Sequence, residues 1–229
     1  MQTLLMGGQA CVYYGAAEFS KDVDFAILAD ASNIGRLQNA LSELEARLIA
    51  VPRLELDFLE RGHAVHFRCG REDVENLLVD VMAKMRGVDD FEQLWERRTT
   101  AVYEDEEFEL LSLPDLVRAK KTQRDKDWPM IRRLVEAHFF EFKAEPTSAR
   151  FDFWLKEART PSILQMVAAR SPSVVEREAA TLARNGAGEV EIEAALRREE
   201  ERERELDRAY WAPLKLELEE LRRVRRLGK

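Results

Sequence analysis

The sequence has little cysteine, little histidine and no long apolar run, and each shortage excludes a class of protein. Its two cysteines, Cys11 and Cys69, are too few for a disulfide framework or a structural zinc site. Three histidines leave little room for a His-rich metal cage. No apolar run approaches the ~18–20 residues of a membrane-spanning helix, and no basic segment leads into an apolar stretch at the N-terminus. We therefore expect a soluble, cytoplasmic protein with no membrane partner.

Basic residues are also in deficit. The 229 residues include 36 Lys and Arg against 44 Asp and Glu, which gives a net charge of −8. Proteins that coat nucleic acid use a basic surface, so this balance argues against that task. It leaves room for a small basic pocket that holds one nucleotide. The apolar fraction of 45% is sufficient for a buried core, and the charged fraction of 35% predicts many solvated helices.

The composition changes near Glu145-Pro146 and predicts two regions. Residues 1–142 contain the strand patterns and most of the glycines, which predicts an α/β region with a small mixed sheet. Residues 143–229 are predicted to be nearly all helical. Strands are expected at 3–6, 23–28 and 77–82, β-like pieces at 54–58 and 63–68, and a hairpin from 99–103 and 108–111.

Helix signals dominate after the hairpin. Ser112 with Asp115 predicts a capped helix start, and a further helix is expected from Asp127 through Phe142. Thr160-Pro161 and Ser171-Pro172 each predict the first turn of a helix. A long charged helix is expected from Glu189, with a kink or break at Pro213. Such helices favour a solvated surface or association with a partner or a second copy.

Three acids carry the chemistry that the sequence suggests. Asp22 and Asp24 lie two residues apart in a predicted strand, so their carboxylates share one face. Paired carboxylates repel unless a cation lies between them, and oxygen ligands of this kind suit Mg²⁺. Asp80, inside the apolar strand 77–82, is a candidate third ligand of a two-metal site. The alternative interpretation of Asp80 is a buried acid paired with an arginine such as Arg68.

A glycine pair precedes the acids. Gly7-Gly8 lies where the first strand is expected to pass into a helix. Glycines at such a junction let backbone N–H groups approach a triphosphate, and a helix N-terminus favours anions. The alternative interpretation is a plain turn.

In these residues the sequence resembles the nucleotidyltransferase superfamily, which has the DNA polymerase β-like fold. The resemblance covers roughly residues 3–142 and is closest to the minimal nucleotidyltransferases and the AbiEii-type toxins. It implies that Asp22 and Asp24 bind Mg²⁺ or Mn²⁺ and that Asp80 completes the site and activates an acceptor hydroxyl. The implied reaction transfers a nucleoside monophosphate from an NTP such as ATP to tRNA, a protein or a small molecule. Gly7, Gly8 and Ser20 would hold the β- and γ-phosphates.

The basic residues after Ser112 extend the resemblance. Relatives often carry a Leu-Pro-Asp-Leu-Ile helix, then a lysine, then Arg-x-Lys-Asp. The corresponding residues here are Leu113-Pro114-Asp115-Leu116-Val117, Lys120, Arg124, Lys126 and Asp127. Lys120 or Lys121 would then bind a nucleotide phosphate. The alternative interpretation of these lysines is a solvated helix face.

Two further features bear on these interpretations. Many relatives have Arg where this sequence has Glu18, which reverses a charge beside the phosphate site. Glu18 favours the alternative function, a catalytically silent regulatory or interaction protein such as a toxin–antitoxin component. His63 and His66 would face opposite sides of a strand, so we do not expect them to bind a metal.

Overall fold

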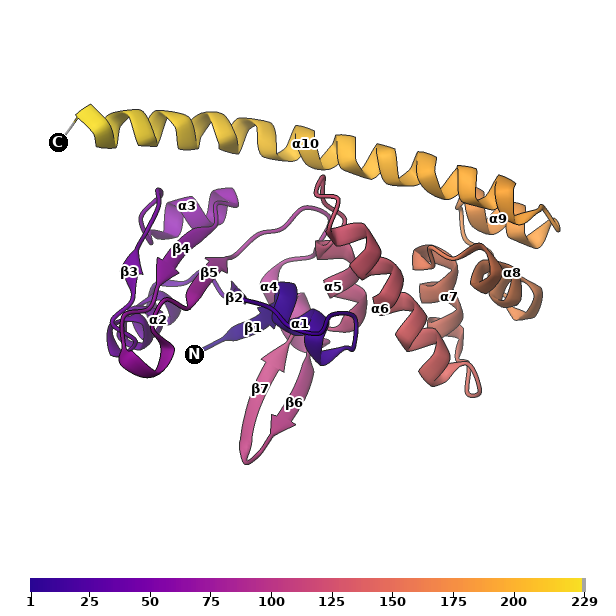
Figure 1. The fold of residues 1–229 in the computed structure, drawn as a ribbon, viewed down its shortest axis with the longest axis horizontal. Helices are drawn as coiled ribbons and strands as arrows, with labels where there is room; N and C mark the ends of the chain where they lie inside the picture. Colours follow the sequence, from indigo (N-terminus) through magenta and orange to yellow (C-terminus); the bar gives the residue numbers. More distant parts are fainter. Residues whose placement is uncertain (228–229) are drawn as a thin grey trace. The chain divides into compact units, whose positions relative to one another are not determined.

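Strands from the first half of the chain form one mixed sheet. The computed structural model describes residues 1–227, and within them the sheet has seven strands in the order β3-β4-β5-β2-β1-β7-β6 (Figure 1). Their bounds are β1 (Thr3–Met6), β2 (Asp22–Ile27), β3 (Arg47–Leu48), β4 (Val65–Arg68), β5 (Leu78–Met82), β6 (Thr99–Tyr103) and β7 (Glu106–Leu110). The pairs β2–β5 and β1–β7 are parallel, and the other neighbours are antiparallel. The predicted α/β class with a mixed sheet and later helices is confirmed.

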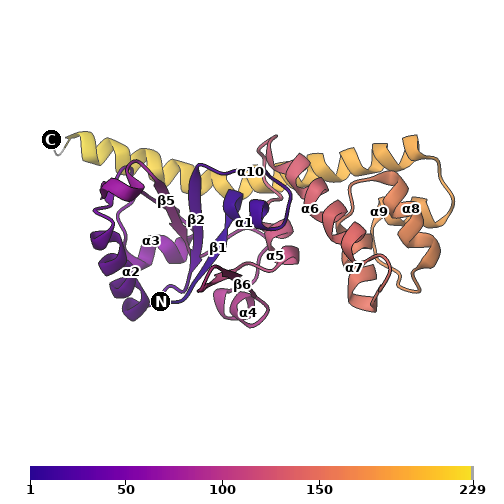
Figure 2. The ribbon, with the colours of Figure 1, turned by 60° about the horizontal axis from the view of Figure 1, so that its bottom comes forward.

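One face of the central strands is apolar and is covered by two helices. Helix α2 (Ala31–Glu43) presents apolar residues at helical spacing, and α3 (Leu56–Arg61) adds one more. The buried core consists of Ile27, Ile34, Leu37, Leu41, Leu59, Val65, Phe67, Cys69, Val79 and Val81. Figure 2 shows α2 and α3 on one side of the sheet. Because strand residues alternate between faces, Asp24 and Asp80 lie on the side opposite this core.

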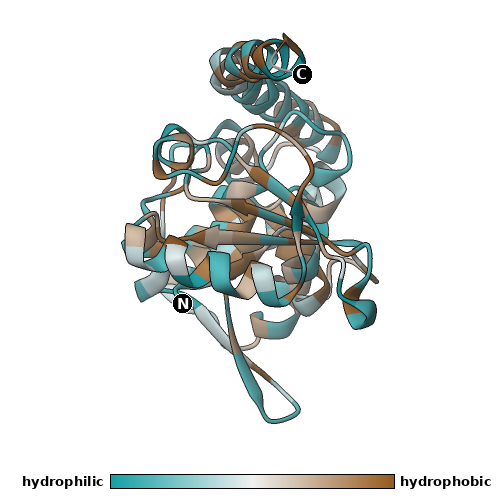
Figure 3. Ribbon diagram, turned by 90° about the vertical axis from the view of Figure 1, so that its left-hand side faces the viewer, coloured by the Kyte–Doolittle hydropathy of each residue, from teal (hydrophilic) through white to brown (hydrophobic). Residues whose placement is uncertain are grey.

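Short elements complete the sheet region. They are α1 (Gly7–Tyr13), the 3₁₀ turn η1 (Glu72–Val74), α4 (Phe91–Glu96) and α5 (Leu113–Ala119). The predicted cap of α5 is present, because Ser112 Oγ contacts Asp115 Oδ2 at 2.7 Å and accepts from the Asp115 N–H at 3.4 Å. The predicted hairpin is also present as β6 and β7, and its tip is hydrophilic in Figure 3 while the central strands are largely apolar.

The later part of the chain is helical, as predicted. The helices are α6 (Asp127–Phe142), α7 (Ser148–Glu157), α8 (Pro161–Arg170), α9 (Glu178–Arg184) and α10 (Glu189–Leu227). Helix α9 ends at its C-cap Asn185, and Gly186 immediately past it adopts φ = +78°.

Two local predictions are wrong, each for an identifiable reason, and a third is corrected in part. Residues 56–61 form α3 rather than a β-like piece, because Asp57 and Arg61 pair at i and i+4 and Gly62, with φ = +98°, ends the helix. Ser171 ends α8 instead of starting a helix: its N–H donates to the Val167 carbonyl at 2.8 Å. Helix α10 continues through the exposed Pro213, so the break that was one of the two predicted outcomes is absent, and the kink stays a prediction.

Contacts within the chain define two compact units. The first, which we call the sheet unit, contains Met1–Tyr13, Ala17–Ala119 and Ala209–Lys229. The second, the helical unit, contains Tyr14–Ala16 and Lys120–Arg208. The predicted domain boundary between residues 142 and 143 stays a prediction. Among the described helices, none combines the length and the apolar character that crossing a membrane requires.

Candidate functional site

The acids predicted to form the site lie on two paired strands of the sheet unit, β2 and β5. In the parallel pair β2–β5, Asp24 is directly opposite Asp80. Residues paired in register project to the same face of a sheet, so these two carboxylates are neighbours on the face away from the apolar core. Asp22 shares that face because it precedes Asp24 by two residues. The sheet continues the row on either side, with Met6 opposite Asp24 and His66 opposite Asp80.

The turn between β1 and α1 lies directly against the side chain of Asp24. Gly7 has φ = +64°, a backbone conformation that other residues rarely adopt. A Cβ atom at Gly7 would lie 1.8 Å from Asp24 Oδ2, so any side chain would displace the carboxylate. The backbone N–H of Gly8 donates to the same oxygen at 3.4 Å. Glycine is therefore required here by both conformation and space, which the interpretation of a plain turn does not explain.

Ser20 packs against the second glycine. A Cβ atom at Gly8 would lie 2.2 Å from Ser20 Oγ. The Ser20 hydroxyl donates to the Asp22 carbonyl at 3.1 Å, and Gln9 Nε2 donates to the Ser20 carbonyl at 3.1 Å. These bonds hold the segment before β2 against the start of α1. Gly7, Gly8 and Ser20 are thus brought together with Asp22 and Asp24, as a shared phosphate site would need.

The sequence analysis missed His66 as a member of this row. His66 Nδ1 lies 2.7 Å from Asp80 Oδ1, and both side chains are about one-third exposed (37% and 30%). Asp80 therefore pairs with a histidine and not with Arg68, the partner named as its alternative. The signal was available: Val65 and Phe67 are apolar core residues of β4, so His66 between them must face the other side, where the acids lie.

Electrostatics tie His66 to the acids. Its hydrogen bond to Asp80 raises the pKa of His66 above the ordinary value of 6.5, and the charges of Asp80 and Asp24 act in the same direction. Burial and the positive charge of Arg222 oppose the rise in this pKa. The acid row therefore favours the cationic form of this imidazole relative to an isolated histidine.

The donor atoms of the row suit a hard cation. Mg²⁺ typically takes one or two carboxylates and completes its octahedron with water and substrate phosphates, and Asp22 with Asp24 supplies such a pair. Within residues 1–227, however, no group of three or more His, Cys, Asp or Glu side chains is placed so that it could hold a metal ion by itself. A metal at Asp22 and Asp24 would therefore depend on phosphate oxygens for further ligands. That all three acids share metal ions stays a prediction.

Lys120 and Lys121 belong to the helical unit, and both ammonium groups have carboxylate partners. Helix α5 ends at Ala119, so neither lysine lies on the helix that was expected to carry them. Lys120 is buried, with Nζ 3.3 Å from Asp127 Oδ1. Lys121 Nζ lies 2.7 Å from Glu157 Oε2. A solvated helix face is thus the wrong description of these two residues, while the predicted contact with a nucleotide phosphate stays a prediction.

No protein-family model and no curated protein sequence matches the chain. Among solved structures, the chain is similar to the crystal structure of an antigenic nucleotidyltransferase-like protein from Paracoccidioides brasiliensis, with a TM-score of 0.33 and 16% sequence identity. The match covers 69% of this chain and 85% of that one. At this level of similarity, the case for a function depends on the side chains described above.

Proposed function

We propose that the sheet unit transfers a nucleoside monophosphate from an NTP to a hydroxyl group of an acceptor in a metal-dependent reaction. The observation that carries the proposal is the row formed by Asp24 and Asp80 in register on β2 and β5, with the Gly7-Gly8 backbone in contact with Asp24. Two neighbouring carboxylates on the polar face of a sheet repel each other, and this repulsion favours a cation beside them.

Each residue has a proposed role. Asp22 and Asp24 would hold Mg²⁺ or Mn²⁺, which when bound neutralises charge on the triphosphate. Gly7, Gly8 and Ser20 would hold the β- and γ-phosphates through backbone N–H groups and a hydroxyl. Catalysis in such a site is mainly positioning and charge stabilisation.

Asp80 would act on the acceptor. Its carboxylate would take the proton of the acceptor hydroxyl as that oxygen attacks the α-phosphorus and pyrophosphate leaves. The bond from His66 to Asp80 Oδ1 would orient the carboxylate and leave its second oxygen for the acceptor. The acceptor class, whether tRNA, a protein or a small molecule, is the part of the proposal to be identified by assay.

The test is calorimetric titration of the full chain with ATP and the other NTPs in the presence and absence of Mg²⁺. Asp24→Asn should abolish Mg²⁺-dependent binding while holding or raising the free energy of unfolding, because it relieves repulsion between neighbouring carboxylates. Asp57→Asn is the matched control: Asp57 is an exposed acid of α3, with 72% of its side chain accessible, and its loss should leave binding unchanged. Equal binding by the parent and Asp24→Asn would contradict the proposed site.

A specific observation also supports a second candidate, a catalytically silent interaction protein such as a toxin–antitoxin component. Asp80 already pairs with His66, and the last turns of α10 expose Leu216, Val224 and Leu227 (69%, 58% and 80%). These three residues follow helical spacing and form one apolar stripe. Absence of Mg²⁺-NTP binding by folded parent protein, together with self-association that Leu216→Glu abolishes, would favour this candidate over the enzyme.

A further inference from the structure

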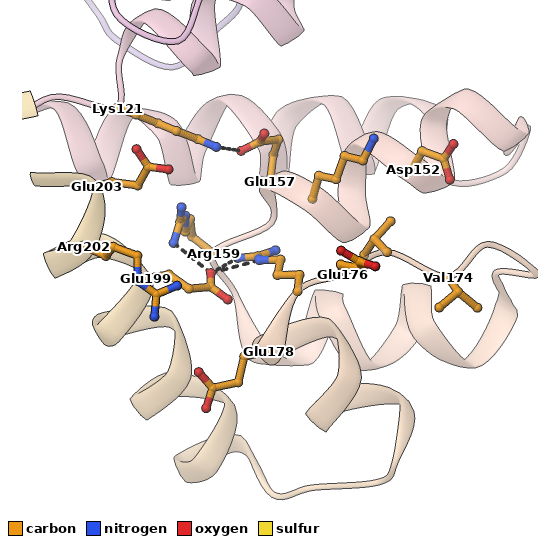
Figure 4. Close-up of a pocket in the computed structure, with 13 residues that line it drawn as sticks. Lys121, Asp152, Glu157, Arg159, Val174, Glu176, Glu178, Glu199, Arg202 and Glu203 are labelled. Carbon is orange, nitrogen blue, oxygen red and sulfur yellow. Dashed lines mark hydrogen bonds and ion pairs between the residues drawn. The ribbon is translucent and has the colours of Figure 1, made fainter. Parts of the chain in front are cut away.

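The helical unit contains a pocket that the acid row does not explain. Its volume is about 580 Å³, and charged side chains dominate its walls (Figure 4). The lining residues come from the segment after α5, from α7 and the residue pair after it, from the segment between α8 and α9, from the start of α9 and from α10. They are Lys121, Asp152, Lys156, Glu157, Arg159, Val174, Val175, Glu176, Arg177, Glu178, Glu199, Arg202 and Glu203.

Two arginines share one carboxylate at the centre of the pocket. Arg177 Nε and Nη2 both lie 2.9 Å from Glu199 Oε2, and Arg159 Nη1 lies 3.4 Å from the same oxygen. Figure 4 shows Arg159 and Glu199 in the pocket, with dashed lines for the ion pairs. Two positive charges against one negative charge leave a local excess of one positive charge in a largely buried position.

The two arginines differ in how fully they are bonded. Arg177 also donates to the carbonyls of Leu155 and Ala158, at 2.8 and 2.9 Å, so both ends of its guanidinium have acceptors. Arg159 has only the long bond to Glu199 and a stacking contact with Trp128, whose ring centroid lies 4.9 Å from its Cζ. Within residues 1–227, the Nε of Arg159 is buried and has no hydrogen-bond acceptor.

This under-bonding is costly because the Arg159 side chain is only 9% exposed. Burial, and next the charge of Arg177, lower the pKa of Arg159, while the charges of Glu199, Glu157 and Glu200 act in the opposite direction. A buried charged donor without a partner costs more than a neutral one, and an anion in the pocket would relieve that cost. Structural pairing alone does not explain Arg159, since its neighbour Arg177 already holds Glu199.

The rim adds two cations that have no ion pair among the described residues, Lys156 and Arg202. By contrast, two of the pocket's carboxylates are neutralised in place, Glu157 by Lys121 at 2.7 Å and Glu178 by Arg198 at 2.5 Å. Asp152, Glu176 and Glu203 also line the pocket, and their charges would repel an extended polyanion such as a nucleic acid backbone. The lining has six carboxylates against five cations, so a site for an anion is confined to the part formed by Arg159, Lys156 and Arg202.

We propose that this pocket binds the phosphate group of a small phosphorylated molecule, with Arg159 as the central donor and Lys156 and Arg202 at the rim. A guanidinium presents its N–H groups in a planar fork that matches phosphate oxygens, and two further cations favour a doubly charged group over a carboxylate. Val174 and Val175 supply apolar wall for the rest of the molecule. The site is independent of the nucleotidyl transfer proposed for the sheet unit.

The test is calorimetric titration of the full chain with inorganic phosphate at constant ionic strength, with acetate as the carboxylate probe. Arg159→Gln should weaken phosphate binding by about tenfold or more, because a charge-assisted hydrogen bond is lost. Arg202→Gln should weaken it by a few-fold. Arg197→Gln is the matched control for Arg202→Gln. Arg197 also lies on α10, but it is 74% exposed and does not line the pocket.

Glu199→Gln gives an independent result in the opposite direction. It removes the negative charge that competes for Arg159 while keeping a similar shape, so phosphate should bind more tightly. Circular dichroism and thermal unfolding of each variant identify any that fail to fold; if Arg159→Gln does, Glu199→Gln and Arg202→Gln decide the question. Phosphate binding that is not saturable, that Arg197→Gln weakens as much as Arg202→Gln, or that acetate matches would overturn the proposal.

Discussion

The sheet unit and the helical unit use their charged residues differently. In the helical unit the principal acids are buried among cations: Asp127 is fully buried and contacts Lys120 and Arg124, and Glu199 contacts two arginines. In the sheet unit the acids form a half-exposed row on one face of a sheet, where Asp80 pairs with a single imidazole.

The difference separates structural charge from charge that can still bind a ligand. A buried carboxylate surrounded by cations already has its charge compensated within the protein and cannot bind a further cation. Removing either partner leaves an uncompensated buried charge. Neighbouring carboxylates on an accessible face retain capacity for a cation. By this criterion the acid row is where we propose a cation in the sheet unit, and the anion proposed in the helical unit would bind beside Arg159, whose Nε has no acceptor among the described residues.

The largest effect is expected from Asp127→Asn. Asp127 Oδ1 lies 3.3 Å from Lys120 Nζ, and its Oδ2 lies 2.5 Å from Thr122 Oγ1 and 2.7 Å from Arg124 Nε. Burial by itself would raise the pKa of Asp127, but Lys120, Thr122 and Arg124 together lower it. Neutralising it leaves Lys120 as a buried charge without compensation, which should lower the free energy of unfolding by about 3–5 kcal/mol.

Asp125→Asn is the control for this prediction. Asp125 is two residues away and also pairs with an arginine, Arg204, but its side chain is 98% exposed. Exposed pairs contribute about 0–1 kcal/mol, so chemical denaturation should show little change. If Asp127→Asn and Asp125→Asn destabilise the protein equally, the buried ion pairs of Asp127 are no more important for stability than an exposed pair.

The second effect tests the turn beside the acid row. Gly7→Ala must adopt φ = +64° and place Cβ 1.8 Å from Asp24 Oδ2, so we expect a loss of about 2–4 kcal/mol in the free energy of unfolding. Gly87→Ala is the control, because Gly87 has φ = +70° with no atom within 4 Å of the added Cβ. It should cost about 1 kcal/mol from backbone strain alone. Denaturant unfolding of both variants makes the comparison, and equal costs would show that the turn does not press on Asp24.

Much of the fold was predictable from periodicity. Alternation in β2 and β5 and helical spacing in α2 specify which side chains enter the core, and Ser112 with Asp115 marks the start of α5. The failures occur where local signals compete with tertiary contacts. Leu54–Phe58 has the apolar content of a strand, but Gly62 with its positive φ ends a helix there. Ser171-Pro172 resembles a helix start, although the Ser171 N–H is already used to end α8.

The site was predictable in part. Strand spacing places Asp22 and Asp24 on one face, but the register that aligns Asp24 with Asp80 depends on pairing between strands more than 50 residues apart, which spacing does not reveal. The lysines illustrate the opposite error. Lys120 and Lys121 read as a basic helix, and only the tertiary structure supplies their partners Asp127 and Glu157.

The smallest effect concerns two histidines with opposite shifts, one in each unit. Burial, and next the charge of Arg150, lower the pKa of His138 to about 4, whereas the bond to Asp80 raises the pKa of His66. His138 Nδ1 accepts from Trp154 Nε1 at 2.9 Å, and this bond requires the neutral ring because a protonated Nδ1 cannot accept. NMR titration of the imidazole protons should therefore show His66 titrating above pH 6.5 and His138 near pH 4.

The two shifts change stability in opposite directions with pH. Between pH 6.5 and 4 the unfolded chain binds a proton at His138 that the folded chain does not, so stability falls by about 1–2 kcal/mol from pH 7 to pH 5. The contribution of His66 is complete below pH 6.5 and is lost as the pH rises through its raised folded value. His138→Asn, which keeps an acceptor for Trp154, should remove the loss on the acid side. Asp80→Asn should return the pKa of His66 toward 6.5 and leave the pKa of His138 unchanged. An unchanged pKa of His66 in that variant would show that its rise does not depend on Asp80.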